Sequence, residues 1–140
     1  MNTSHESIGA EEFRERFLAV FGPGGGQGLP RKRRDQHILF RAVVQSLGRA
    51  AYSESELKDA LESWLSLVEL GDRFDHVSLR RYLVDAGYLQ RDPGGSAYAV
   101  CPAGREEVLF DAAVREVDVL EVIQSAHLRV AERKRDWAHR

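Results

Sequence analysis

The side chains of this chain that are best suited to chemistry are cations rather than nucleophiles. The segment PRKRR places an arginine or a lysine at each of residues 31–34, and a second adjacent pair is Arg80 and Arg81. Guanidinium and ammonium groups donate hydrogen bonds to phosphate oxygens, and arginine also reads the edge of guanine. These residues predict contact with a nucleic acid.

Around a helix, neighbouring residues lie about 100° apart, so Arg80 and Arg81 cannot face the same way. We expect Arg81 to face outward and Arg80 to lie at the edge of the buried stripe, paired with an acid such as Asp75 or Glu56. Arg73 and Arg91, at either end, are expected to contact the backbone of the duplex. The candidate DNA-binding residues are Arg31, Lys32, Arg33, Arg34, Arg73, Ser78, Arg80, Arg81 and Arg91.

Catalytic and metal-binding patterns are sparse. The histidines are scattered without HxxxH or HExxH spacing, and they are His5, His37, His76, His127 and His139. Cys101 precedes Pro102 and is expected to fill the base of a hairpin. The segment GPGGGQG lacks the preceding strand and the lysine of a phosphate-binding loop, so it is interpreted as a linker. We predict no enzymatic activity, no cofactor, no metal and no small-molecule ligand.

These side chains must be positioned by helices and one hairpin. Apolar residues at helical spacing predict helices over residues 11–21, after Pro30 up to Gly48, from the capping box at Ser53, and from Asp75 to Ala86. The segment DPGG predicts a hairpin turn. The four cations at residues 31–34 would oppose the dipole of the helix that follows them. They therefore either find acidic partners within the fold or contact phosphate.

The order helix, helix, helix and hairpin is typical of a winged helix-turn-helix, in which the helix before the hairpin enters the major groove. We predict a mainly α chain with a small β-hairpin (α+β), in three parts. Residues 1–28 form an N-terminal helix and linker, residues 29–103 a winged-helix-like domain, and residues 104–140 a long C-terminal helix. The predicted function is a DNA-binding transcriptional regulator or accessory factor. The alternative is a protein-interaction module of the same fold, since residues 27–100 hold eleven Lys and Arg against ten Asp and Glu.

Apolar residues recur at helical spacing along the predicted helix of residues 104–140. This apolar stripe is too long for one small domain to cover, so it predicts a partner. A second copy is the simplest choice, because most soluble oligomers are two-fold homodimers. The predicted interface residues are Leu109, Ala113, Val117, Leu120, Ile123 and Val130. With 43% hydrophobic and 30% charged residues, a single cysteine and no long apolar run, the chain is expected to be a cytoplasmic protein without a membrane span.

The segments LPRKRRDQHILF, YSESELKDAL and DHVSLRRYLVDAGYLQRDPGGSAYAV together resemble the domain of unknown function 2087 family. The resemblance extends from about Leu29 to Val100. It implies a bacterial, cytoplasmic protein associated with transcriptional regulation, because members occur alone or fused behind a winged-helix module in proteins described as regulators. The sequence departs from the family pattern at Lys58, where asparagine is expected.

Overall fold

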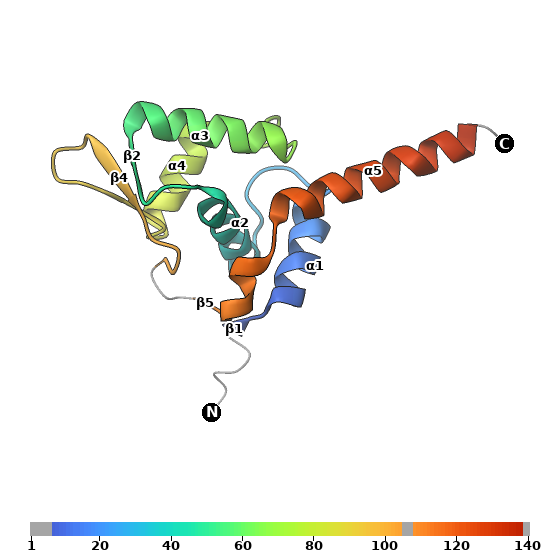
Figure 1. Cartoon of the computed structure of the whole chain (residues 1–140), viewed down its shortest axis with the longest axis horizontal. Helices are drawn as coiled ribbons and strands as arrows, with labels where there is room; N and C mark the ends of the chain where they lie inside the picture. Colours follow the sequence, from blue (N-terminus) through green and yellow to red (C-terminus); the bar gives the residue numbers. More distant parts are fainter. Residues whose placement is uncertain (1–6, 105–107, 139–140) are drawn as a thin grey trace.

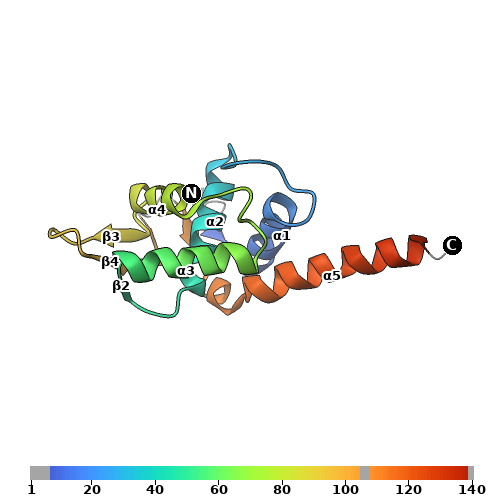
Figure 2. The same cartoon turned by 90° about the horizontal axis from the view of Figure 1, so that it is seen from above.

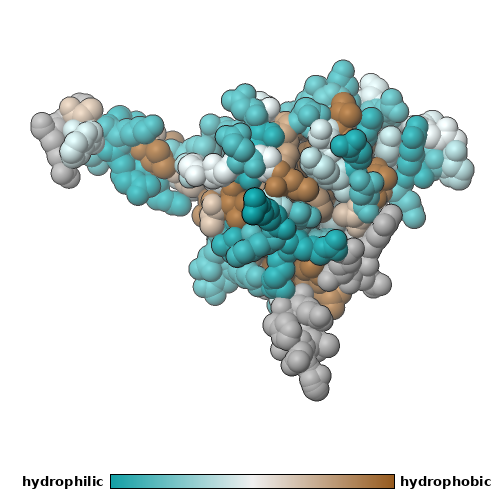
Figure 3. Space-filling view, turned by 180° about the vertical axis from the view of Figure 1, so that it is seen from behind, coloured by the Kyte–Doolittle hydropathy of each residue, from teal (hydrophilic) through white to brown (hydrophobic). Residues whose placement is uncertain are grey.

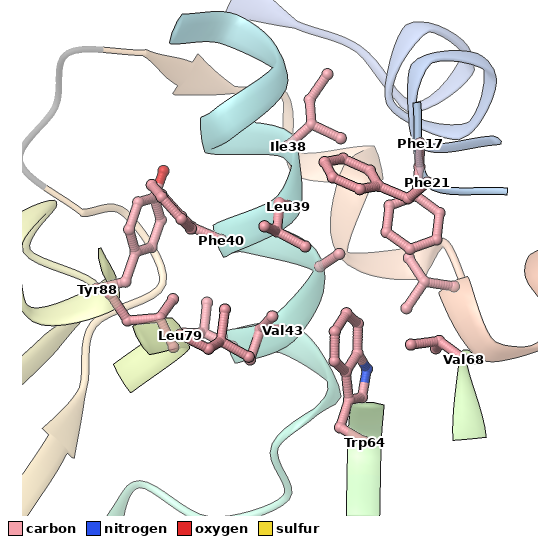
Figure 4. Close-up of a cluster of buried hydrophobic side chains, with 14 of the residues drawn as sticks. Phe17, Phe21, Ile38, Leu39, Phe40, Val43, Trp64, Val68, Leu79 and Tyr88 are labelled. Atoms are coloured by element: carbon pink, nitrogen blue, oxygen red, sulfur yellow. The ribbon is translucent and has the colours of Figure 1, made fainter. Parts of the chain in front are cut away.

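Helices make up most of this protein, and α2 (Arg33–Ser46) runs through its core (Figures 1 and 4). The computed structural model describes residues 7–104 and 108–138. The other elements, in chain order, are β1 (Ser7–Ile8), α1 (Ala10–Phe21), β2 (Ala51–Ser53), α3 (Glu54–Leu67), α4 (His76–Asp85), β3 (Leu89–Arg91), β4 (Ala97–Val100), β5 (Leu109–Phe110), the 3₁₀ helix η2 (Ala112–Glu116) and α5 (Val119–Ala138). The predicted mainly α class with a small β component is confirmed.

The core forms around α2 because this helix is apolar on several faces. Phenylalanines of α1 recur once per turn and pack on one side of it, which confirms the predicted stripe. Trp64 of α3 approaches from a second side, and Tyr88 lies beside Phe40 on a third (Figure 4). The fully or almost fully buried aromatic residues are Phe13, Phe17, Phe21, Phe40, Tyr52, Trp64, Phe74, Tyr88 and Tyr98.

Local signals set the ends of α3 and α4 as expected. The Ser53 hydroxyl accepts from the Glu56 N–H at 3.1 Å while the Glu56 carboxylate accepts from the Ser53 N–H at 2.9 Å, so the capping box is present. Asp75 caps α4 by accepting from the Ser78 N–H at 2.8 Å. Gly87 follows the helix with φ of +85°, a conformation that glycine adopts without strain.

The predicted hairpin is present, and a third strand joins it. β3 and β4 pair antiparallel with Gln90 opposite Ala99. β2 then pairs with the other edge of β4, so the strand order is β2-β4-β3 and Tyr52 faces Tyr98 across the ladder. Cys101 is half-buried at the base of the hairpin, where its N–H donates to the Tyr88 carbonyl at 2.8 Å. Sequence patterning did not reveal β2, because three residues are too few to show a period.

The prediction of one long helix from residue 104 is wrong. The helix of this segment, α5, begins only at Val119. The carboxylate of the preceding Asp118 accepts a hydrogen bond from the Glu121 N–H and so caps the first turn. Before it, β5 pairs in parallel with β1, and η2 turns Val114 into the core. An irregular segment that buries valines at intervals leaves the same spacing in the sequence as a helix does. Residues 105–107 lie outside the described residues.

The start of α2 also differs from expectation. α2 begins at Arg33 rather than at Pro30, with Lys32 as its N-terminal cap. On α4, Val77 is 52% exposed, because the buried positions of that helix are Leu79 and Leu83. α4 therefore presents an apolar side chain to solvent beside its polar ones.

α5 extends well beyond the rest of the molecule (Figures 1 and 2). Its first turns pack on the core through Ile123, but residues 131–138 are all exposed. Among the described residues, no helix combines the length and the apolar character needed to cross a membrane.

Candidate nucleic-acid interface

The outer face of α4 carries Arg81 as its exposed cation, as predicted. Asp85, also exposed, lies one turn later on the same face, so a carboxylate is near this guanidinium. Ser78 is committed to the helix start, since its hydroxyl donates to Asp75 Oδ2 at 3.0 Å. The hydrogen bonds from Ser78 hold the pKa of the Asp75 carboxyl below its usual value. Ser78 thus orders the N-terminal end of α4.

Arg80 lies at the edge of the buried stripe as expected, but its partner differs from the prediction. Its guanidinium carbon is 5.8 Å from the centroid of the Tyr98 ring, and that of Arg91 is 6.0 Å from the same centroid. Both are within cation–π range. The predicted acidic partners serve elsewhere, because Asp75 caps α4 and Glu56 caps α3 and binds Arg49. Tyr98 therefore joins α4 to the hairpin, a role that no sequence signal indicated.

The four-cation segment divides into two parts. Arg34 binds Glu12 of α1 with Nη2–Oε1 at 2.7 Å and Nε–Oε2 at 3.1 Å. The adjacent Asp35 is buried and accepts two hydrogen bonds from Arg16, the shorter at 2.8 Å. The sequence left open whether these cations pair with acids of the fold or contact phosphate. Arg34 pairs with an acid of the fold. Arg31, Lys32 and Arg33 remain exposed.

The start of α2 adjoins the end of α4. Arg33 and Gln36 share a pocket of ≈ 240 Å³ with Tyr82 and Asp85, and the buried His37 also lines it. His37 Nδ1 and the Tyr88 hydroxyl are 2.7 Å apart, which links α2 to the segment that follows α4. The basic segment and the outer residues of α4 therefore belong to neighbouring parts of one surface.

Arg73 was predicted to contact the backbone of a duplex, and the structure gives it another role. Its Nε donates to the Gly28 carbonyl at 2.9 Å and its Nη1 to the Val20 carbonyl at 2.6 Å. The guanidinium also lies 4.9 Å from the Phe21 ring centroid. Burial lowers the pKa of this guanidinium. Arg73 holds both ends of the glycine-rich segment, because an arginine fork can donate to two carbonyls at once.

The residues predicted for a dimer interface do not form one free stripe. Val117 and Ile123 are buried in the core of their own chain, and Leu120 packs against it. Leu109 and Ala113 are exposed but precede α5. Of these six residues, Val130 lies furthest along α5, in its projecting part, residues 128–138.

That projecting part includes Val130, which is partly exposed, and two large apolar side chains that sequence reasoning did not select. Leu128 is 63% exposed and Trp137 is 74% exposed. The space-filling view shows this part as largely hydrophilic with isolated apolar patches (Figure 3).

Reactive residues are dispersed within the described part of the chain. His76 Nε2 lies 3.6 Å from the carboxylate of Glu62 in α3, and His127 Nε2 lies 3.7 Å from the carboxylate of Glu69, which follows α3. Over residues 7–104 and 108–138, no three metal-ligating side chains gather. His5 and His139 lie outside the described residues.

Comparison with known proteins gives one family. A family model described as "Uncharacterized protein conserved in bacteria" matches residues 27–100, which run from the segment before α2 to the end of β4. No curated protein and no solved structure matches the chain.

Proposed function

This chain belongs to the DUF2087 family of uncharacterized proteins conserved in bacteria, and we propose that it is a transcriptional regulator or accessory factor that binds double-stranded DNA. Such a protein would act in the cytoplasm. The proposal concerns the family segment, in which α4 and the β3–β4 hairpin supply the contacts with the duplex.

The topology supports a winged helix-turn-helix core. α2, β2, α3 and α4 are followed by the two strands of the hairpin, and β2 closes the sheet in the order β2-β4-β3. In winged helices the helix before the hairpin lies in the major groove while the hairpin contacts the flanking backbone. Here α4 is the helix that precedes the hairpin, and its Arg81 is exposed to solvent. Arg91 lies at the end of β3, where the hairpin turn begins.

The observation that carries the proposal is the exposure of cations on adjoining elements. Five cations of the candidate set are exposed, and one of them, Arg91, also contacts the Tyr98 ring. These five are Arg31, Lys32, Arg33, Arg81 and Arg91. Val77, exposed one turn before Arg81, suits contact with a thymine methyl group.

The five exposed cations set the expected salt dependence. If each neutralises one phosphate, log K should fall against log salt with a slope of about −4.5, since each contact contributes about −0.9. Fluorescence anisotropy with a labelled duplex of random sequence measures this slope directly. Lys32→Ala and Arg81→Ala should each reduce it by about 0.9.

Arg14→Ala is the matched control, because Arg14 is an exposed arginine on α1, outside the family segment. It should leave the slope unchanged. Absence of anisotropy change at low salt, or equal losses for Arg14→Ala and Arg81→Ala, would refute DNA binding by this surface.

The alternative function is a protein-interaction module of the same fold. The exposed Asp85 on α4 favours it, since a carboxylate one turn after Arg81 would repel a phosphate backbone. Flat DNA titrations would select this alternative.

We further propose that the projecting part of α5 pairs with a second copy. Leu128 and Trp137 expose large apolar area there, and isologous pairing of a helix is the simplest way to cover it. A two-fold dimer would also suit DNA, because it presents two copies of α4 to two half-sites.

A further inference from the structure

Two arginines share one aromatic ring at the junction between α4 and the β3–β4 hairpin (Figures 1 and 2). Arg80 belongs to α4 and Arg91 to β3, and their guanidinium carbons lie 5.8 Å and 6.0 Å from the centroid of the Tyr98 ring. We propose that Arg80 and Arg91 together bind one phosphate group of the DNA backbone. This inference rests on the proposed function, in which α4 and the hairpin contact the duplex.

The strand register places Arg91 on the same side of the hairpin as α4. Arg91 lies opposite Tyr98, and residues that face each other across an antiparallel ladder project to one face of the sheet. Leu89, two residues before Arg91, projects to this face as well and is 1% exposed. Tyr98 is 3% exposed and is contacted by Arg80 of α4, so α4 lies on this face. The two guanidinium groups therefore approach one ring from the same side of the sheet.

Neither arginine is neutralised within the fold. In the part of the chain that the structure describes, Arg80 and Arg91 contact the Tyr98 ring but form no ion pair and no hydrogen bond. The carboxylate next to Arg91, that of Asp92, accepts instead from the N–H groups of Ser96 and Ala97 at 2.9 Å and 3.1 Å. Two cations beside one ring repel each other, and an anion bound between them removes that repulsion. Phosphate suits this position because guanidinium groups donate charge-assisted hydrogen bonds to its oxygens.

The hairpin turn fixes the position of Arg91. Gly95 has φ of +75°, and a Cβ at this residue would lie 2.9 Å from Arg91 Nη2 and 3.3 Å from Arg91 Cζ. The guanidinium thus lies against the backbone of the turn, in space that glycine leaves open. A side chain already held in its binding position loses less conformational entropy when the ligand arrives.

The first test titrates inorganic pyrophosphate into the isotope-labelled full chain and follows the arginine Nε–Hε signals by NMR. The signals of Arg80 and Arg91, assigned with the variants Arg80→Lys and Arg91→Lys, should shift together and saturate with a single Kd. Arg14 and Arg81 are exposed arginines, and their signals serve as controls that should show no saturable shift over the same range. The titration contains no DNA, so failure of this site and failure of DNA binding are distinguishable.

The second test measures the coupling of the two arginines in duplex binding by fluorescence anisotropy. Arg80→Gln and Arg91→Gln should each raise the Kd for a random duplex about tenfold, the effect of losing one charge-assisted contact. Because both side chains bind the same phosphate, the double variant should lose about ten- to thirtyfold in affinity rather than the product of about a hundredfold. Circular dichroism confirms that the variants are folded.

Arg80→Gln combined with Arg81→Gln is the matched control for coupling. Neighbouring helical residues diverge by about 100°, so these two side chains contact different groups and their losses should multiply.

Three results would overturn the proposal. The first is a pyrophosphate titration in which the signals of Arg80 and Arg91 do not move or saturate with different Kd values. The second is a full product of losses in the double variant Arg80→Gln/Arg91→Gln, which would show that the two arginines contact separate groups. The third is saturable pyrophosphate binding together with unchanged duplex affinity in both single variants, which would assign the site to a phosphorylated small molecule instead of DNA.

Discussion

Replacing Arg73 tests whether this arginine stabilises the fold or binds a ligand. Arg73→Ala removes two hydrogen bonds to backbone carbonyls and the stacking on Phe21 and Phe74. A hydrogen bond from a charged donor contributes about 1.5–3 kcal/mol, and a cation–π contact about 0.5–1 kcal/mol at a partly exposed site. Because such contributions overlap, we expect a loss of about 2–4 kcal/mol in the free energy of unfolding.

Urea denaturation followed by circular dichroism measures this loss. With an m-value of about 2 kcal/mol/M, the midpoint should fall by about 1–2 M. Arg73→Lys should lie between the parent and Arg73→Ala, since an ammonium group lacks the planar fork that reaches both carbonyls. Arg81→Ala is the control, and its exposed side chain should change stability by less than about 0.5 kcal/mol.

In DNA binding the order of the two variants should be reversed, with Arg81→Ala affected and Arg73→Ala unaffected. Below its unfolding transition, Arg73→Ala should retain the parent salt slope, whereas Arg81→Ala should lose about 0.9 of it. An Arg73→Ala variant with an unchanged urea midpoint and a weakened affinity for DNA would refute this assignment. It would show that Arg73 contacts DNA and does not stabilise the fold through Val20 and Gly28.

Two further predictions concern acid stability and assembly. Hydrogen bonds from backbone N–H groups hold the pKa of Glu56, Asp75 and Asp92 below their usual values of 4.5, 3.8 and 3.8, so each carboxylate stabilises the fold above those values and loses its effect as the pH falls through the lower folded-state value. The free energy of unfolding should therefore decrease below about pH 4.5, and Asp75→Asn, which keeps an acceptor but does not titrate, should show a smaller decrease between about pH 6 and pH 3 in urea titrations. Removing residues 128–140 should convert dimers to monomers in light scattering while leaving the core intact, because residues 131–138 are exposed and Ile123 is retained. A full-length chain that is already monomeric, or a shortened chain that stays dimeric, would contradict pairing through α5.

Several elements of this protein could be predicted from sequence because their causes are local. The phenylalanines of α1 recur once per turn, the Ser53–Glu56 capping box starts α3, and the Asp92–Gly95 segment turns the hairpin. Each signal depends on residues within one or two turns of one another, so it can be recognised without knowledge of distant contacts.

The sequence alone also determined which side chains could contact phosphate, since that depends on residue type. The tertiary structure decided which of them remain at the surface. Arg34 and Arg73 look no different in sequence from Arg33 and Arg81, but one binds Glu12 of a helix 22 residues away and the other binds carbonyls up to 53 residues away. The apolar residues of the C-terminal segment also differ in exposure because of tertiary contacts. Ile123 is covered by the chain's own core, whereas Trp137 is exposed. A side chain's partner is set by what folding brings beside it, and that information is distributed over the whole chain.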